Sequence, residues 1–148
     1  MCIRDRYSAA NNHYVFEITE TIEMDQIPAV QNVFKEFVKN DFRFAIDDFG
    51  TGYSNYGYMR DRTFDIVKVD RSFVTDIDKL KDNYLMVSFI IKMAHEMGLH
   101  VCIEGVETKE ELSCVKKLGA DYIQGYYYGK PVCLQDFEEQ HLKRFVLG

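Results

Sequence analysis

Apolar residues follow two kinds of spacing along the chain. Short runs rich in β-branched and aromatic residues predict strands, and these runs cover residues 14–18, 42–46, 64–69, 99–103 and 122–123. Between them, apolar residues recur three or four positions apart, which predicts amphipathic helices over residues 27–38, 84–97, 112–118 and 134–145. Strands that alternate with helices are typical of a parallel sheet with right-handed crossovers. The pattern therefore predicts an α/β fold.

Two of the predicted helices carry end signals. Thr108 with Glu111 three residues later matches a capping box, and Gly119 stands where that helix should end. Gly98 stands in the same position after the helix over residues 84–97. About five strands and four helices are too few for an eight-stranded barrel, which typically takes ~250 residues. We expect either an open sheet or an incomplete barrel.

Composition narrows the class of protein. The chain of 148 residues is 47% hydrophobic and 28% charged, which suits a soluble globular domain. A formal net charge of −6 argues against broad binding of DNA, which usually needs a basic face. No apolar run reaches the roughly 20 residues that span a bilayer, and no secretory signal is evident. We therefore expect a cytoplasmic location with no membrane contact from this segment, although the parent protein could be anchored upstream.

The N-terminus and the cysteines carry no pattern of their own. Residues 1–6 show neither helical nor strand periodicity, so we expect residues 1–10 to be disordered or artefactual and residues 11–148 to form the domain. An ordinary flexible terminus is the alternative. The absence of a C-x-x-C pair favours reduced thiols over a disulfide framework or a zinc site. The cysteines are Cys2, Cys102, Cys114 and Cys133.

Polar clusters fall at the ends of four of the predicted strands. They cover residues 17–20, 47–54, 68–70 and 104–108, and each contains at least one carboxylate. Carboxylates are costly to bury alone, so several that converge on one edge of a sheet are explained most simply by metal ions that neutralise them. The clusters therefore predict a metal-dependent active site.

Some of these residues have simpler interpretations. Adjacent acids such as Asp47 and Asp48 are usually a solvated turn, because only a pair at the very end of a strand can point into one site. The glycines at 50 and 52 do not complete a dinucleotide-binding pattern, because Asn55 stands where a third glycine is required. The four histidines share no ligand spacing. The tyrosines at 126–128 are interpreted as packing at the rim, with stacking on guanine as the alternative.

Five motifs in order resemble the EAL family of bacterial cyclic di-GMP phosphodiesterases. They are Glu17-Ile18-Thr19-Glu20, residues 47–55, residues 67–74, Glu104 to Thr108, and Gln124-Gly125-Tyr126-Tyr127 with Lys130-Pro131. The resemblance implies an incomplete (β/α)₈ TIM-like barrel, comprising roughly the last five β/α units. The signature Glu-Ala-Leu strand and a following strand with an asparagine ligand are absent from this sequence, which implies that the fragment alone is inactive.

The resemblance assigns metal-binding roles to four acids. Glu17 is similar to a ligand of the first metal, and Asp47 is similar to the carboxylate that bridges both metals. Asp48 corresponds to a ligand of the second metal, and Glu104 to the acid that holds this metal or its water. Oxygen ligands favour Mg²⁺ or Mn²⁺, so the resemblance implies a two-metal site.

Four further residues receive roles around this site. Lys68 matches a lysine near the attacking water and the phosphate, and Gln124 a glutamine that completes the shell of water and metal. With Glu104, these form the predicted catalytic set. An ammonium among anions keeps its proton, so we interpret Lys68 as electrostatic and positioning rather than as a general base. Glu20 resembles the acid that braces the loop over residues 47–55, and Glu107 occupies an outer position.

The implied activity is the metal-dependent hydrolysis of cyclic di-GMP to linear pGpG. The alternative is a catalytically inactive EAL-like module that binds cyclic di-GMP or serves in protein interactions, and a third is an orphan fragment. The family also implies partners: a possible homodimer through the loop after Asp48, and upstream regulatory or diguanylate cyclase domains in the parent protein.

Overall fold

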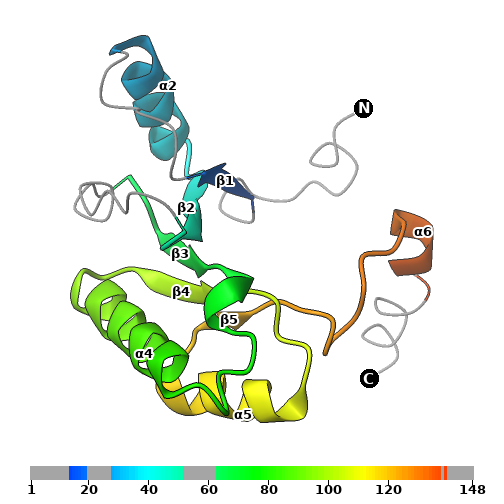
Figure 1. The fold of residues 1–148 in the computed structure, drawn as a ribbon. Helices are drawn as coiled ribbons and strands as arrows, with labels where there is room; N and C mark the ends of the chain where they lie inside the picture. Colours follow the sequence, from blue (N-terminus) through cyan, green and yellow to red (C-terminus); the bar gives the residue numbers. More distant parts are fainter. Residues whose placement is uncertain (1–13, 20–27, 52–62, 138, 140–148) are drawn as a thin grey trace.

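The structure is a computed structural model that describes residues 14–19, 28–51, 63–137 and 139 (Figure 1). Five parallel strands form one sheet in the order β1-β2-β3-β4-β5. They are β1 (Val15–Thr19), β2 (Arg43–Phe49), β3 (Ile66–Val69), β4 (His100–Ile103) and β5 (Tyr122–Ile123). The helices are α2 (Pro28–Lys39), α4 (Lys81–Glu96), α5 (Lys109–Leu118) and α6 (Leu134–Phe137), with a 3₁₀ turn, η3 (Arg71–Phe73).

The predicted α/β fold is confirmed. Each strand pairs with the next strand along the chain, whereas a doubly wound sheet reverses its strand order at a switch point. A strictly sequential parallel sheet with intervening helices is the arrangement of a (β/α)₈ barrel. The described sheet is therefore consistent with part of a TIM barrel, and the open-sheet alternative is disfavoured.

The outward face of the sheet packs against the helices. Figure 1 shows α4 and α5 together beside β4 and β5. The buried core is apolar, and fully burying one of its valine, leucine, isoleucine or phenylalanine side chains contributes roughly 1.5–3 kcal/mol. Its strand residues include Phe44, Ile46, Val67, Val69, Val101 and Ile103, and its helix residues include Val87, Ile90, Ile91, Ala94, Leu112 and Val115.

Aromatic residues join α2 to the first two strands. Phe34 of α2 lies over Phe44 of β2 with 4.7 Å between ring centroids, and Phe37 meets Phe16 edge-on at 5.2 Å. Phe16 also stacks on Phe44 at 5.7 Å. Offset and edge-to-face pairs of this kind add to the energy of burial. They fix β1 beside β2, and so place Glu17 beside the acids of β2.

The structure confirms both ends predicted for α5. Thr108 and Glu111 form the reciprocal capping box, and Gly119 caps the C-terminus with a φ of 90°. Gly98 has a φ of 79° after α4, as expected for a left-handed position. Of the helix predicted over residues 134–145, the structure describes α6 only to Phe137.

Cysteine pairing and membrane spans can be checked in part. Cys102, Cys114 and Cys133 are free thiols, as predicted, whereas Cys2 lies outside the described residues. Within the ranges that the structure covers, no helix has the length and apolar character needed to cross a membrane.

Candidate active site

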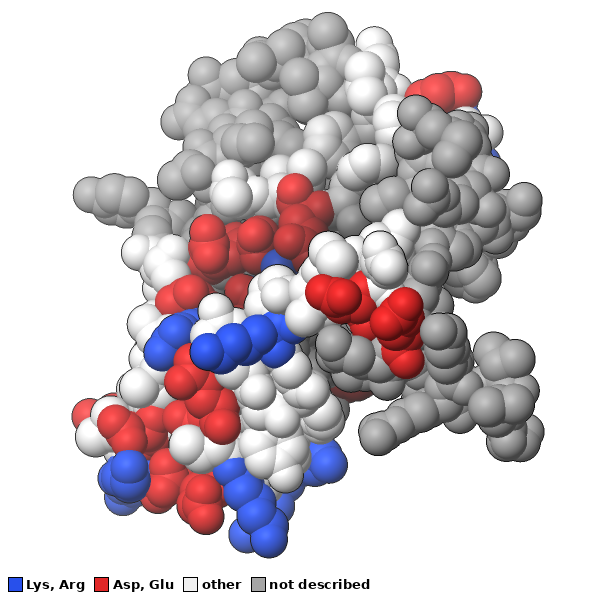
Figure 2. All heavy atoms as spheres, turned by 90° about the vertical axis from the view of Figure 1, so that its right-hand side faces the viewer, with Lys and Arg blue, Asp and Glu red and all other residues white. Residues whose placement is uncertain are grey.

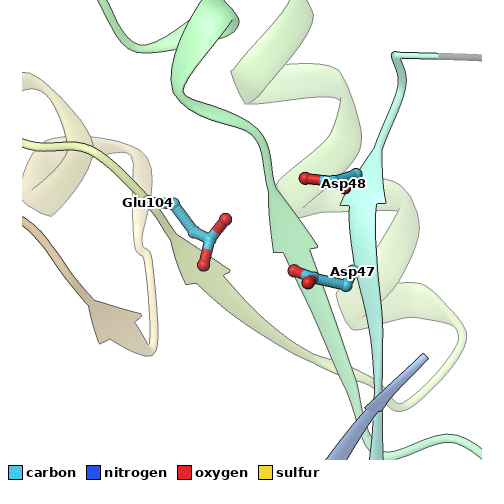
Figure 3. Close-up of side chains that lie close together, drawn as sticks. All are labelled: Asp47, Asp48 and Glu104. Atoms are coloured by element: carbon cyan, nitrogen blue, oxygen red, sulfur yellow. The ribbon is translucent and has the colours of Figure 1, made fainter. Parts of the chain in front are cut away.

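A bulge at the end of β2 places two acids on one edge of the sheet. Ile46 pairs with Val67 and Phe49 with Val69, so three steps along β2 match two steps along β3. The extra residue lies between these pairs, where Asp48 has a φ of 54°. A regular strand would send Asp47 and Asp48 to opposite faces, but a bulge interrupts that alternation. In Figure 3 both carboxylates point from β2 toward Glu104 at the end of β4.

Lys68 lies at the centre of the site. It belongs to β3, the middle strand, and is only 5% exposed. Its Nζ donates a hydrogen bond to Asp47 Oδ1 at 2.8 Å and forms ion pairs with Glu17 Oε2 at 2.8 Å and Glu104 Oε1 at 2.7 Å. One ammonium thus gathers carboxylates from β1, β2 and the residue after β4, and brings together four of the predicted site residues.

Asp47, Asp48 and Glu104 also form a group suited to a metal ion. Each offers one oxygen, and these oxygens lie within 4.8 Å of one another. Carboxylate oxygens are the donors that Mg²⁺ and Mn²⁺ prefer, and three acids on one rim can converge on an ion with small movements. The residues therefore fit a divalent cation. Figure 2 shows acidic side chains gathered on this face, with basic side chains directly below them.

Charge coupling shifts the pKa values of this cluster. Burial lowers the pKa of Lys68, but hydrogen bonds to Asp47, Glu104 and Glu17 outweigh it, so the pKa is raised and the ammonium stays charged. For Glu104, burial raises the pKa despite the opposing hydrogen bond from Lys68. Burial, followed by the charge of Glu104, raises the pKa of the Cys102 thiol to about 11. Since Lys68 remains protonated, it cannot serve as a general base at neutral pH.

The loop that carries Glu104 is held by a second carboxylate. Glu111, in the first turn of α5, is buried and accepts hydrogen bonds from the backbone N–H groups of Glu107 at 2.9 Å and Thr108 at 3.0 Å. Its other oxygen accepts from the N–H of Asp76 at 3.2 Å. Sequence reasoning identified Glu111 only as a capping residue. The contact with Asp76, 35 positions away, carries no sequence signal.

Glu107 lies on the far side of this loop. Its carboxylate pairs with Arg71 at 3.1 Å. Within the described part of the chain, it forms no ion pair with Lys68. Arg71 follows β3 and Asp70 and begins η3. Its pairing with Glu107 links the ends of β3 and β4, which supports an outer position for Glu107.

Gln124 follows β5 and lines two cavities. Its N–H donates to Ile103 at 2.8 Å, which ties it to the end of β4. An inner cavity of about 390 Å³ is lined by Gln124, Glu17 and Lys68, with Cys102 among its other walls. A larger one of about 740 Å³ is lined by Gln124 and the segment after it. Gln124 thus faces the same inner side of the sheet as Lys68.

The tyrosines after β5 are not packed as interpreted from the sequence. Tyr126, Tyr127 and Tyr128 are 53%, 41% and 55% exposed. Tyr126 and Tyr128 line the larger cavity, and Lys130 lies over the Tyr126 ring at 5.4 Å. Glu20 and residues 52–55 lie outside the described residues, so the predicted bracing of the loop after Asp48 stays a prediction.

The model of the EAL domain matches residues 2–131. The chain belongs to the EAL domain family. It is 35% identical over 131 residues to the cyclic di-GMP phosphodiesterase PdeB of Shewanella oneidensis, covering 88% of this chain and 15% of PdeB. The curated relatives that it matches are long, and the chain spans a third or less of their length.

Solved structures of EAL proteins share the fold. The EAL enzyme Bd1971, in its form bound to cAMP and cyclic di-GMP, superposes with a TM-score of 0.82 at 35% identity over 92% of this chain and 36% of Bd1971. The complex of Klebsiella pneumoniae BlrP1 with manganese and cyclic di-GMP gives 0.75 at 29% identity over 85% and 32% of the two chains. The resemblance read from the motifs is therefore confirmed at the level of the family and its fold.

Proposed function

We propose that the protein containing this EAL domain hydrolyses cyclic di-GMP to linear pGpG with two divalent cations, Mg²⁺ or Mn²⁺. The observation that carries the proposal is the convergence of Asp47, Asp48 and Glu104 beside the buried ammonium of Lys68. An isolated group of acids has many explanations. A group that shares a charged lysine in a member of this family is best explained as a site for phosphodiester hydrolysis.

The residues divide the work as follows. Asp47, Asp48, Glu104 and Glu17 would hold the cations, which would supply hydroxide near neutral pH and would stabilise the attacking and leaving oxygens. A water oxygen forms the new bond to phosphorus, the bond to the leaving ribose oxygen breaks, and that oxygen takes up a proton. Lys68, kept charged by its partners, stabilises negative charge on the phosphate.

Gln124 is placed to act beside these residues. It lines the inner cavity together with Lys68 and Glu17. Its amide can both donate to and accept from a water molecule. We assign it the positioning of the attacking water. We expect the isolated 148-residue chain to be inactive, because the resemblance places two metal ligands outside this sequence.

The proposal is tested by Asp48→Asn in the complete reading frame. The rate of pGpG production is measured by chromatography in assays that contain Mg²⁺ or Mn²⁺. It should fall roughly 100-fold or more because a charged metal ligand is lost. Asp78→Asn replaces an exposed aspartate of the same charge between η3 and α4 and should leave the rate unchanged. Undiminished turnover in Asp48→Asn would refute the assignment, and tight binding of cyclic di-GMP without turnover by the wild type would favour the inactive module.

A further inference from the structure

The ammonium of Lys68 contacts three carboxylates at once. An ammonium group has three N–H donors and no acceptor. In this structure Nζ lies 2.8 Å from Glu17, 2.8 Å from Asp47 and 2.7 Å from Glu104. While these contacts persist, three carboxylates at 2.7–2.8 Å compete with a phosphate oxygen or a water molecule for the donors of the ammonium. For Lys68 to contact the substrate, at least one of these carboxylates must therefore move away from the ammonium.

Two of the three acids bound by Lys68 also belong to the group suited to a cation. Asp47 and Glu104 belong to both sets, and Asp48 belongs to the cation group alone. Glu17, which the resemblance assigns to a cation, contacts the lysine but lies outside the three acids whose oxygens converge. A divalent ion that used Asp47 and Glu104 would lie within a few ångströms of Nζ. Like charges repel strongly at such distances where water is excluded. The ion and the lysine therefore compete for the same oxygens.

From this overlap we infer that Lys68 is an internal counter-cation that holds the carboxylates together before a metal arrives and is partly displaced when one binds. This inference rests on the metal site proposed above. It adds that the release of Lys68 from its carboxylate partners is coupled to metal binding. The ammonium can therefore contact the phosphate only after the cation has bound. Lys68 thus acts as a positioning residue whose partners change during loading.

The first test measures metal affinity without substrate. In the complete reading frame, Lys68→Met should bind Mn²⁺ roughly tenfold more tightly by calorimetry, because a competing positive charge is gone. In a chelator, the same variant should melt at a lower temperature than the wild type, and added Mn²⁺ should raise its melting temperature by a larger amount. Lys79→Met removes an exposed lysine paired with Asp76 and should change neither quantity.

The second test needs no variant at the site. With lysine labelled at Cε, the NMR signal of Lys68 in the wild type should move as Mg²⁺ is added and stop moving at saturation. The signal of Lys79 should stay in place. Equal or weaker Mn²⁺ affinity in Lys68→Met, or a stationary Lys68 signal at saturating Mg²⁺, would overturn the inference while leaving the proposed hydrolysis intact. Conversely, a metal-saturated wild type without turnover would refute only the hydrolysis.

Discussion

Glu111 offers the sharpest test of how the loop of Glu104 is held. The residue is 6% exposed, and its carboxylate accepts from three backbone N–H groups, two within its own loop and one from Asp76. One oxygen serves both Glu107 and Thr108, and the other serves Asp76 alone. Removing this carboxylate should therefore loosen the loop and detach it from the segment before α4.

Glu111→Gln and Glu111→Ala should lower the free energy of unfolding by different amounts, because they remove different numbers of acceptors. In Glu111→Gln, the amide oxygen can keep the bonds to Glu107 and Thr108, but the amide nitrogen then faces the donor of Asp76. We expect a loss of about 1.5–3 kcal/mol, the usual range for one hydrogen bond to a charged group. In Glu111→Ala all three donors lose their acceptor, so the loss should reach about 3–5 kcal/mol. Urea unfolding followed by circular dichroism measures both.

The pH dependence gives an independent check. Burial raises the pKa of Glu111, but the hydrogen bonds from Glu107, Thr108 and Asp76 outweigh it, so the folded-state pKa lies below the usual value for a glutamate. A lowered folded pKa means that this group stabilises the fold above its unfolded pKa and that the contribution disappears as the pH falls through the folded value. The difference in unfolding free energy between wild type and Glu111→Gln should be constant above about pH 5.5 and shrink below about pH 4.5.

The reasoning fails on either of two results. If Glu111→Ala were no less stable than Glu111→Gln, the three backbone contacts would not carry the energy. If the difference between wild type and Glu111→Gln stayed constant down to pH 3, ionisation of this carboxyl would not be linked to folding. Glu110→Gln, a change of charge at an exposed position of the same helix turn, is the matched control.

Two further predictions concern other parts of the inner face. A Cβ at Gly125 would overlap the backbone oxygen and nitrogen of Val106, so Gly125→Ala should lower the free energy of unfolding, measured in urea, by about 1–3 kcal/mol. Gly129 has open space around it, so Gly129→Ala should leave the free energy of unfolding unchanged. Equal stability of the two variants would contradict the close approach of Gly125 to Val106. With a pKa of about 11, Cys102 should be alkylated by iodoacetamide far more slowly at pH 8 than the exposed Cys133, and its rate should climb as the pH approaches 11. Equal rates by peptide mass spectrometry would show that the thiol is not shielded.

The sequence predicts the order of elements well because burial dominates it. The alternation of strands and helices, the apolar runs and the capping box all depend on local spacing, and the structure confirms them. The end of β2 was predicted too early: the expected strand stopped at Ile46, whereas β2 continues to Phe49 through a bulge. A left-handed residue inside a strand depends on tertiary contacts, and although Asp adopts that conformation more readily than most residues, propensity alone does not locate it.

The site was predictable in its membership but not in its connections. Acids near the carboxyl ends of predicted parallel strands are expected along one edge of the sheet, which is why Glu17, Asp47 and Glu104 could be grouped before the structure was known. That one lysine would contact all three depends on side-chain reach and on the register between strands. The pairing of Glu107 with Arg71 likewise joins two loops whose separation the sequence does not give.

Stability alone does not account for the cluster around Lys68. The interior of a (β/α)₈ barrel is normally filled by branched apolar side chains, and replacing a buried ion pair by apolar residues of similar volume is often neutral or stabilising. Here the central strand instead places a lysine at 5% exposure among three carboxylates, while the opposite face of the same strand carries Val67 and Val69 with no exposure at all. One face of β3 is thus apolar and packed as in an ordinary core, whereas the other face carries a buried charge. A departure confined to the side that faces the acids of neighbouring strands is best explained by chemistry carried out there.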